Sequence, residues 1–349
     1  MNGARIGVML ITAWSVMGGQ REKAFELNDR GIQAAARGEY VEAERLYNQA
    51  LAVWQELGPS YDAHAGTTLY NLGEALVGQG RWRDSVPFFE DGLARDRRLL
   101  GIGHNQTLVT LNVLGNVYMV VGDTEKAEAV FQEALPVERK VCPKGMELAR
   151  TLGGLAALRV REQKLDEALT FADEALQIAV QDLGDDNADT GTLYANVAAV
   201  HRRAGRPERA VPLFRKAHAI YERTVAPDNP MFATLVSQEG LALMEGGQVR
   251  AAEKQLTQAV EMLSHCSGCN FSLAMAENNL SMLRIRQGKY GDADRLLTSA
   301  LALEEQFSER RGPDMAGILE LLSEVREKQR RFDDAALLKK RAAALLSYR

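Results

Sequence analysis

The sequence repeats itself at an interval of 41 or 42 residues along almost its whole length. The segment GDTEKAEAVFQEALP, residues 122–136, shows the repeated pattern: a glycine, an alanine five residues later, then an aromatic residue and a second alanine. The residues equivalent to its glycine, called turn residues below, are Gly38, Gly80, Gly122, Gln163, Gly205, Gly247, Gly288 and Arg330. A length of 349 residues alone would suggest two or three globular domains, but a fixed period of this kind is typical of a solenoid.

Small residues recur at fixed distances from each turn residue. Seven residues before it stand Gly31, Gly73, Gly115, Ala156, Ala198, Gly240, Ser281 and Ser323. Spacings of three, four and seven place residues on one helical face, where a small residue lets two helix axes approach closely. Glycine at the turn residue suits the left-handed conformation that often ends a helix. The sequence therefore predicts an all-α solenoid of eight repeats, each made of a helix A, a tight turn and a helix B.

The pattern resembles tetratricopeptide repeats, and in particular the longer repeats of kinesin light chains. The segments TLYNLGEALVGQGRWRDSVPFFEDGL and TLNVLGNVYMVVGDTEKAEAVFQEAL carry the resemblance best, and LLGIGHNQT follows the family's Leu-Gly-x-x-His-x-x-Thr loop. The resemblance covers about residues 24–346. It implies a right-handed superhelix whose A helices line a concave groove. It also implies a non-enzymatic scaffold or adaptor that binds an extended peptide or a partner helix in that groove.

Composition excludes several other classes of function. The 42 basic and 47 acidic residues nearly cancel, which argues against general binding to nucleic acid or to a membrane surface. No stretch reaches the ~18 apolar residues that a membrane span requires. The 5 histidines lie in separate repeats, and neither a phosphate-binding loop nor a Ser/His/Asp set can be assembled. We therefore expect no enzymatic activity, no cofactor and no metal.

Ten polar residues on the predicted A helices form the candidate peptide-binding groove. They are Asn71, Asn112, Asn116, Arg150, Arg161, Asn196, Arg202, Arg203, Asn278 and Asn279. Asparagine is a poor helix former, but its amide both donates and accepts hydrogen bonds, which suits the backbone of an extended peptide. Guanidinium groups favour bidentate contacts with carboxylates, so an acidic protein or peptide segment is the expected partner.

Two alternatives to this groove stay open at the level of sequence. The polar residues can equally form an ordinary solvated face, with the arginines paired to neighbours such as Glu162. The protein would then be an architectural component of an assembly that uses its outer surface or its edges, and the groove would be incidental.

The first 19 residues differ in character from the repeats. Arg5 is followed by a mostly apolar run from Ile6 to Met17 and then by two glycines, which is the outline of a secretory signal peptide. This predicts a signal peptide at residues 1–19, a solenoid at residues 20–349, and export to the periplasm or out of the cell. The alternative is an apolar helix packed on the first repeat of a cytoplasmic protein.

The 3 cysteines are Cys142, Cys266 and Cys269. The last two form a Cys-x-x-Cys pair, which lacks the four ligands of a structural zinc site. In an exported protein a disulfide within this loop is the expected state. Inert thiols, and metal or redox chemistry, are the alternatives.

Overall fold

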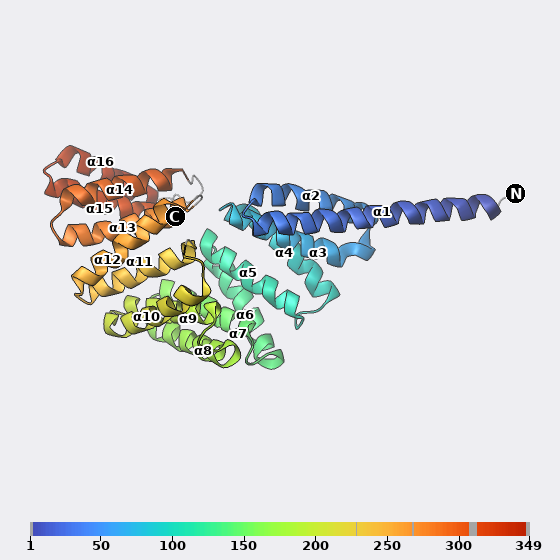
Figure 1. Cartoon of the computed structure of the whole chain (residues 1–349), viewed down its shortest axis with the longest axis horizontal. Helices are drawn as coiled ribbons and strands as arrows, with labels where there is room; N and C mark the ends of the chain where they lie inside the picture. Colours follow the sequence, from blue (N-terminus) through green and yellow to red (C-terminus); the bar gives the residue numbers. More distant parts are fainter. Residues whose placement is uncertain (1–2, 228, 267–268, 307–312, 347–349) are drawn as a thin grey trace. The chain divides into compact units, whose positions relative to one another are not determined.

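The structure of the protein is a computed structural model that describes residues 3–227, 229–266, 269–306 and 313–346 (Figure 1). For residues 3–18, 313 and 314 it describes the backbone alone. Every regular element in these ranges is helical, which confirms the all-α prediction. The chain divides into two compact units, residues 1–178 and 179–349, with the boundary inside helix α8 (Leu165–Leu183).

The first unit contains seven complete helices and most of α8. They are α1 (Gly3–Ala36), α2 (Tyr40–Leu57), α3 (Asp62–Gly78), α4 (Trp82–Leu99), α5 (Asn105–Val121), α6 (Thr124–Val141) and α7 (Met146–Arg161), with a single 3-10 turn at Pro59–Tyr61. The second unit contains α9 (Ala188–Arg203), α10 (Pro207–Thr224), α11 (Pro230–Glu245), α12 (Val249–Ser264), α13 (Asn270–Arg286), α14 (Tyr290–Glu305), α15 (Pro313–Lys328) and α16 (Phe332–Leu346). Odd-numbered helices are the predicted A helices and even-numbered ones the B helices.

Close packing between the two helices of a pair depends on the small residue seven positions before the turn. A Cβ atom added at Gly73 would lie 2.6 Å from the ring of Phe89, and one added at Gly115 would lie 2.5 Å from the ring of Phe131. These separations are too short for any larger residue to fit without a shift. The two phenylalanines are fully buried. The small residue on helix A therefore makes room for the aromatic residue on helix B, as the sequence pattern predicts.

The turn residues adopt the left-handed conformation in every repeat. Their φ angles are 77°, 77°, 89°, 69°, 76° and 71° at the six glycines. Gln163 and Arg330, which replace glycine in the fourth and eighth repeats, have φ angles of 62° and 63°. The turn after Gln163 is closed by a hydrogen bond from the Lys164 N–H to the Arg159 carbonyl oxygen, at 2.8 Å. All eight turns thus share one geometry, whether or not glycine occupies them.

We predict that Gln163→Gly and Arg330→Gly each stabilise the protein by about 0.5–1 kcal/mol. A side chain in the left-handed region carries a steric cost that glycine avoids, and this gain exceeds the entropy that glycine loses on folding. Urea unfolding followed by circular dichroism measures the change. Gln132→Gly is the matched control: Gln132 is exposed inside α6, where glycine should destabilise by roughly 1 kcal/mol. A loss of stability in both turn variants would contradict the assignment.

The N-terminal segment continues into the first repeat without a break. Helix α1 runs from Gly3 to Ala36, so residue 19 is not marked by an interruption of the backbone. The signal peptide at residues 1–19, and the export that it implies, stay predictions. Among the residues that the structure describes, no helix combines the length and the apolar character that crossing a bilayer requires.

The loop between α12 and α13 contains a disulfide. It joins Cys266 to Cys269, whose Cα atoms lie 5.5 Å apart. Cys142 is exposed in the loop between α6 and α7 and carries a free thiol. The disulfide is local and clamps one loop between two helices of the second unit.

Candidate functional site

Several successive A helices contact one another within each unit. In the first unit α1 contacts α3 and α5 contacts α7; in the second unit α11 contacts both α9 and α13. When stacked helix pairs curve toward one of their two layers, the helices of the inner layer lie closest together. Contacts between successive A helices therefore indicate that these helices form the inner surface of each unit.

Four positions on each A helix lie on a face turned from its partner helix, although the ring of Phe25 still contacts Trp54 of α2. They lie 13, 9, 6 and 2 residues before the turn residue, a spacing that puts them on one helical face, and we call this face the inner stripe. In the first unit it consists of Phe25, Asp29, Ile32 and Ala36 on α1, Thr67, Asn71, Glu74 and Gly78 on α3, Val109, Val113, Asn116 and Val120 on α5, and Arg150, Gly154, Ala157 and Arg161 on α7. All are exposed or half-buried except Gly154.

In the first unit, four of the five predicted groove residues lie on the inner stripe. Asn116 and Arg161 are exposed. Asn71 is half-buried, and its amide donates to Asn28 Oδ1 at 3.3 Å. Arg150 is exposed and donates to Glu147 Oε1 at 2.7 Å. These four residues occupy three successive A helices.

The fifth predicted residue of this unit, Asn112, lies inside the stack instead. It is 2% exposed, and its amide nitrogen donates to Glu138 Oε1 at 3.1 Å and to the Glu147 carbonyl oxygen at 3.2 Å. Its amide oxygen accepts from the Thr151 hydroxyl at 2.6 Å. The prediction that Asn112 contacts a ligand is corrected, because its side chain connects α5 to α6 and α7 and has no open face.

In the second unit the predicted residues divide in the same way. Asn196 and Arg203 are exposed on the inner stripe of α9. Arg202 is largely covered, and its Nη1 donates to Glu245 Oε1 at 2.8 Å, which ties α9 to α11. Asn278 is half-buried. Asn279 is 5% exposed and donates to Ser237 Oγ at 3.0 Å. Its side chain is therefore buried and not accessible to a ligand, in contrast to the prediction.

Sequence reasoning missed a pocket on the inner surface of the first unit. The pocket has a volume of about 430 Å³, and its lining from α1, α2 and α3 includes Ile32, Tyr40, Tyr47, Tyr70 and Val77. Two of these tyrosines belong to a B helix: the Tyr40 ring packs against Gly78 of α3, and the Tyr47 ring packs against Gly31 of α1. A Cβ atom at Gly78 would lie 2.6 Å from the Tyr40 ring. In the sequence, the feature that could have indicated this pocket is Gly78, two residues before the turn residue Gly80.

The charge of the inner stripe changes along the first unit. Asp29 and Glu74 place carboxylates on α1 and α3, whereas Arg150 and Arg161 place guanidinium groups on α7. Glu74 keeps an exposed side chain, yet burial by the surrounding protein raises the pKa of its carboxyl. Such a combination is expected for a group at the bottom of a concave surface.

Tyr70 also reports on this concavity. Burial is the main cause of its raised pKa, followed by the negative charges of Glu74 and Glu147. Arg150, on the same helix as Glu147, acts in the opposite direction. Charges two repeats away are therefore close enough to influence a side chain of α3.

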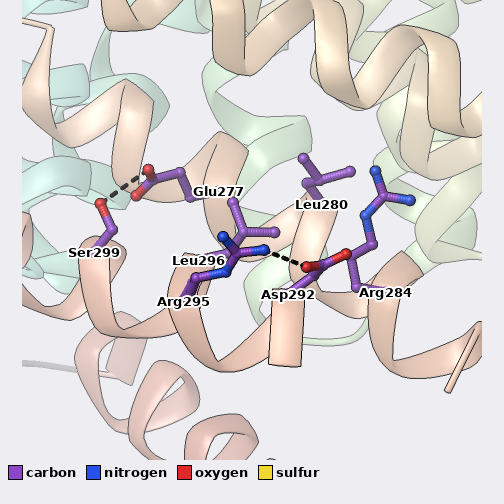
Figure 2. Close-up of a pocket in the computed structure, with 7 residues that line it drawn as sticks. All are labelled: Glu277, Leu280, Arg284, Asp292, Arg295, Leu296 and Ser299. Carbon is purple, nitrogen blue, oxygen red and sulfur yellow. Dashed lines mark hydrogen bonds and ion pairs between the residues drawn. The ribbon is translucent and has the colours of Figure 1, made fainter. Parts of the chain in front are cut away.

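A second pocket lies between α13 and α14 of the second unit (Figure 2). Its charged side chains pair with neighbouring protein groups: Arg295 donates to Asp292 at 2.5 Å, and Ser299 donates to Glu277 Oε1 at 2.9 Å. Arg284 is bonded to Glu253. Burial raises the pKa of Glu277. The predicted groove residues lie elsewhere, and the pairing inside this pocket is explained by contacts between α12, α13 and α14.

Metal chemistry receives no support from the described part of the chain. Across those residues, no group of three or more His, Cys, Asp and Glu side chains is arranged to hold an ion. What the inner stripe offers is hydrogen bonding through amides, ion pairing through arginines and carboxylates, and one apolar pocket. These are properties of a binding surface.

Comparison with known proteins agrees with the repeat pattern. The tetratricopeptide repeat profile matches residues 24–97, 64–140 and 147–223, and a second tetratricopeptide repeat profile matches residues 278–348. Protein KINESIN LIGHT CHAIN-RELATED 2 of Arabidopsis thaliana is 22% identical over 289 residues, which cover 82% of this chain and 43% of the plant protein. The chain thus spans less than half the length of this relative.

Solved structures share the fold at low sequence identity. A Rap protein complexed with Competence and Sporulation Factor superposes with a TM-score of 0.63 and 14% identity, covering 93% of this chain and 98% of that one. BtubC from P. vanneervenii superposes with a TM-score of 0.53 and 19% identity, covering 65% of this chain and 92% of that one. The predicted resemblance to tetratricopeptide repeats of the kinesin light chain type is confirmed.

Proposed function

The chain belongs to the tetratricopeptide repeat family of protein–protein interaction scaffolds, and from that premise we propose that it binds an extended segment of a partner protein along its inner stripe. The partner segment carries acidic groups. Its backbone bonds to the asparagine amides, and its carboxylates pair with the arginines. The protein itself performs no chemistry on this partner.

One observation carries the proposal: amides and a guanidinium group occupy exposed positions of the same helical face in successive repeats. Asn116 lies six residues before its turn residue on α5, and Arg161 lies two residues before its turn residue on α7. Asn196 occupies another position of the inner stripe, nine residues before its turn residue, on α9 of the second unit. An asparagine amide can bond to both the N–H and the carbonyl of an extended backbone, and arginine binds carboxylates in a bidentate way.

Relatives of the same fold give this proposal a precedent of a general kind. The Rap protein of similar fold was solved in complex with Competence and Sporulation Factor, so a chain of this architecture can hold a second molecule. At 14% identity the likeness concerns the fold, and the partner of the present chain has to be found by experiment.

The test begins with selection of binding peptides from a displayed library of natural protein segments, using the whole chain as bait. We predict that Asn116→Ala combined with Arg161→Glu weakens binding of the selected peptides at least tenfold. Hydrogen bonds to charged groups contribute roughly 1.5–3 kcal/mol each, and charge reversal replaces attraction by repulsion. Raising the salt concentration should weaken binding of the wild-type chain as well, because the charges are solvated. Fluorescence anisotropy measures both effects.

The matched control changes the same residue types on the B helices. Asn48 and Arg83 are exposed on α2 and α4, and Asn48→Ala combined with Arg83→Glu should leave the affinity unchanged. The proposal would be contradicted if the selected peptides bound the inner-stripe variant with unchanged affinity but bound the B-helix variant more weakly. That outcome would favour an architectural component that uses its outer surface.

A further inference from the structure

The tyrosine pocket of the first unit is suited to a single apolar or aromatic side chain. Three tyrosine rings and four aliphatic side chains contribute to its lining, and its volume is about 430 Å³. Ile32 at its rim is 47% exposed, so an apolar side chain is accessible at the entrance of the pocket. Tyr70 is held in place by an edge-to-face contact with Phe89, whose ring centroid lies 5.6 Å away. The pocket is therefore open and largely apolar, and Tyr70 in its wall is packed against the core.

Carboxylates surround this pocket on the inner stripe. Glu74 contributes to the lining of the pocket directly, and Asp29 is exposed on the adjacent helix α1. Because burial raises the pKa of the Glu74 carboxyl, a cation placed beside it would relieve an unfavourable desolvated charge. A lysine or arginine next to the inserted side chain would supply that cation.

The opposite charge stands two repeats further along. Arg161 is exposed on α7, and Arg150 on the same helix is already bonded to Glu147. Between the two charged ends, the stripe of α5 is uncharged and includes Val113, Asn116 and Val120. Packed helices lie about 8–10 Å apart, so two repeats span about 20 Å. An extended chain covers that length with about six residues, at ~3.3 Å per residue.

We propose that the inner stripe of the first unit fixes the direction of its ligand by charge. An apolar or aromatic side chain of the ligand enters the tyrosine pocket, a basic residue beside it faces Glu74 and Asp29, and a carboxylate about six residues away pairs with Arg161. The inference rests on the proposed function, and it specifies the ligand as a segment that is basic at its anchored end and acidic at the other. A purely acidic segment would place a negative charge against Glu74.

The test uses synthetic peptides of identical composition and net charge. In the first type a tryptophan stands beside a lysine and is followed, after four serine and glycine residues, by two aspartates. In the second type the tryptophan stands beside the aspartates and the lysine is at the far end. Each type is made in both chain directions, since the pocket defines where the anchor lies and not which way the backbone runs. We expect the first type to bind the whole chain at least tenfold more tightly at low salt.

Variants of the pocket and its rim identify the cause of this preference. Glu74→Lys should reverse the preference, and Ile32→Ser should weaken both peptide types at least fivefold. The matched controls are Glu56→Lys and Val41→Ser, which change exposed residues of α2 and should leave both affinities unchanged. Equal binding of the two peptide types, no measurable binding of either, or a preference that survives Glu74→Lys would each overturn the inference.

Failure of this inference can be told apart from failure of the proposed function. One outcome is that partners selected from the display library lose affinity when Asn116 and Arg161 are replaced but not when Glu74 and Ile32 are replaced. That result would contradict the directional anchor and would leave the proposed scaffold function supported. Partners whose affinity is unchanged by substitutions at all four residues would contradict both the directional anchor and the proposed function.

Discussion

Replacing Phe131 by alanine is expected to reduce the free energy of unfolding by about 3–5 kcal/mol, the range typical of a fully buried phenylalanine. Phe131 is 0% exposed on α6 and packs against two successive A helices. A Cβ atom at Gly115 would lie 2.5 Å from its ring, and one at Gly154 would lie 2.3 Å from it. Its loss therefore opens a cavity between the third and fourth repeats. Urea unfolding monitored by circular dichroism measures the change.

Phe332→Ala is the matched control for this prediction. Phe332 is 64% exposed at the start of α16, so the same truncation there should cost little, within ~0.5 kcal/mol. Gly115→Ala should also destabilise the wild-type protein, because its new methyl group collides with the Phe131 ring, and should cost much less once Phe131 is alanine. A loss of less than 1 kcal/mol in Phe131→Ala would contradict the packing described for this pair.

The fold could be predicted from the sequence because its determinants are local and repeated. The glycine or alanine that allows a close helix crossing recurs at one spacing, so each repeat supports the same assignment. The geometry of the turn even persists at Gln163 and Arg330, where glycine is absent. In these repeats the packing of helix A on helix B imposes the left-handed residue, and the local preference of the side chain is overridden.

The candidate site could be predicted only in part, because exposure depends on how neighbouring repeats pack. Asn71 and Asn112 both fall near the small residue of their A helices, yet they differ by one position relative to the turn. One residue amounts to about 100° around a helix, and it turns Asn112 toward α6 and α7. The tyrosine pocket was missed for a related reason: Tyr40 and Tyr47 belong to a B helix, and only the tertiary structure brings them to the inner surface.

Buried acidic residues were a further feature that the repeat pattern did not predict. Asp96 and Glu138 occupy the same position, 16 residues after their turn residues, and are 2% and 0% exposed. Asp96 accepts hydrogen bonds from Gln106 at 2.9 Å and from Thr110 at 3.2 Å, both on the next A helix. The periodic signal for them is weak: Glu304 stands at the equivalent position of the seventh repeat, but Trp54 stands there in the first. They connect one repeat to the next through polar contacts.

Asn112→Ala is expected to cost about 2–3 kcal/mol at pH 7, because it removes a donor from a buried carboxyl and an acceptor from a buried hydroxyl. Asn112 donates to Glu138 and accepts from Thr151, and both partners are 0% exposed. Thr151 also bonds to the Glu138 carboxyl, but Glu138 Oε2 is buried without a hydrogen-bond partner. Urea unfolding measures the loss, and Asn48→Ala, at an exposed position of α2, provides the control with little expected change.

The loss in Asn112→Ala should be larger at pH 7 than at pH 4. Burial raises the pKa of Glu138 above its ordinary value of 4.5, and hydrogen bonds from Thr151 and then Asn112 counteract that rise. Below pH 4.5 the carboxyl is protonated in both the folded and the unfolded chain, so its ionisation costs nothing. As the pH increases, the unfolded chain releases this proton first, and stability falls until Glu138 ionises in the folded chain as well. Without Asn112 the folded-state pKa is higher still, so the fall continues further.

Adding Glu138→Gln to Asn112→Ala should abolish this dependence on pH, because glutamine does not ionise. The neutral part of the loss, from the acceptor that the Thr151 hydroxyl loses at Asn112, should remain in the double variant. The same pair of variants also decides what Asn112 is for. If Asn112 belonged to the binding surface, its replacement would weaken peptide binding with little change in stability. If it joins α5, α6 and α7, its replacement lowers stability, and peptides held by Asn116 and Arg161 bind the remaining folded protein as before.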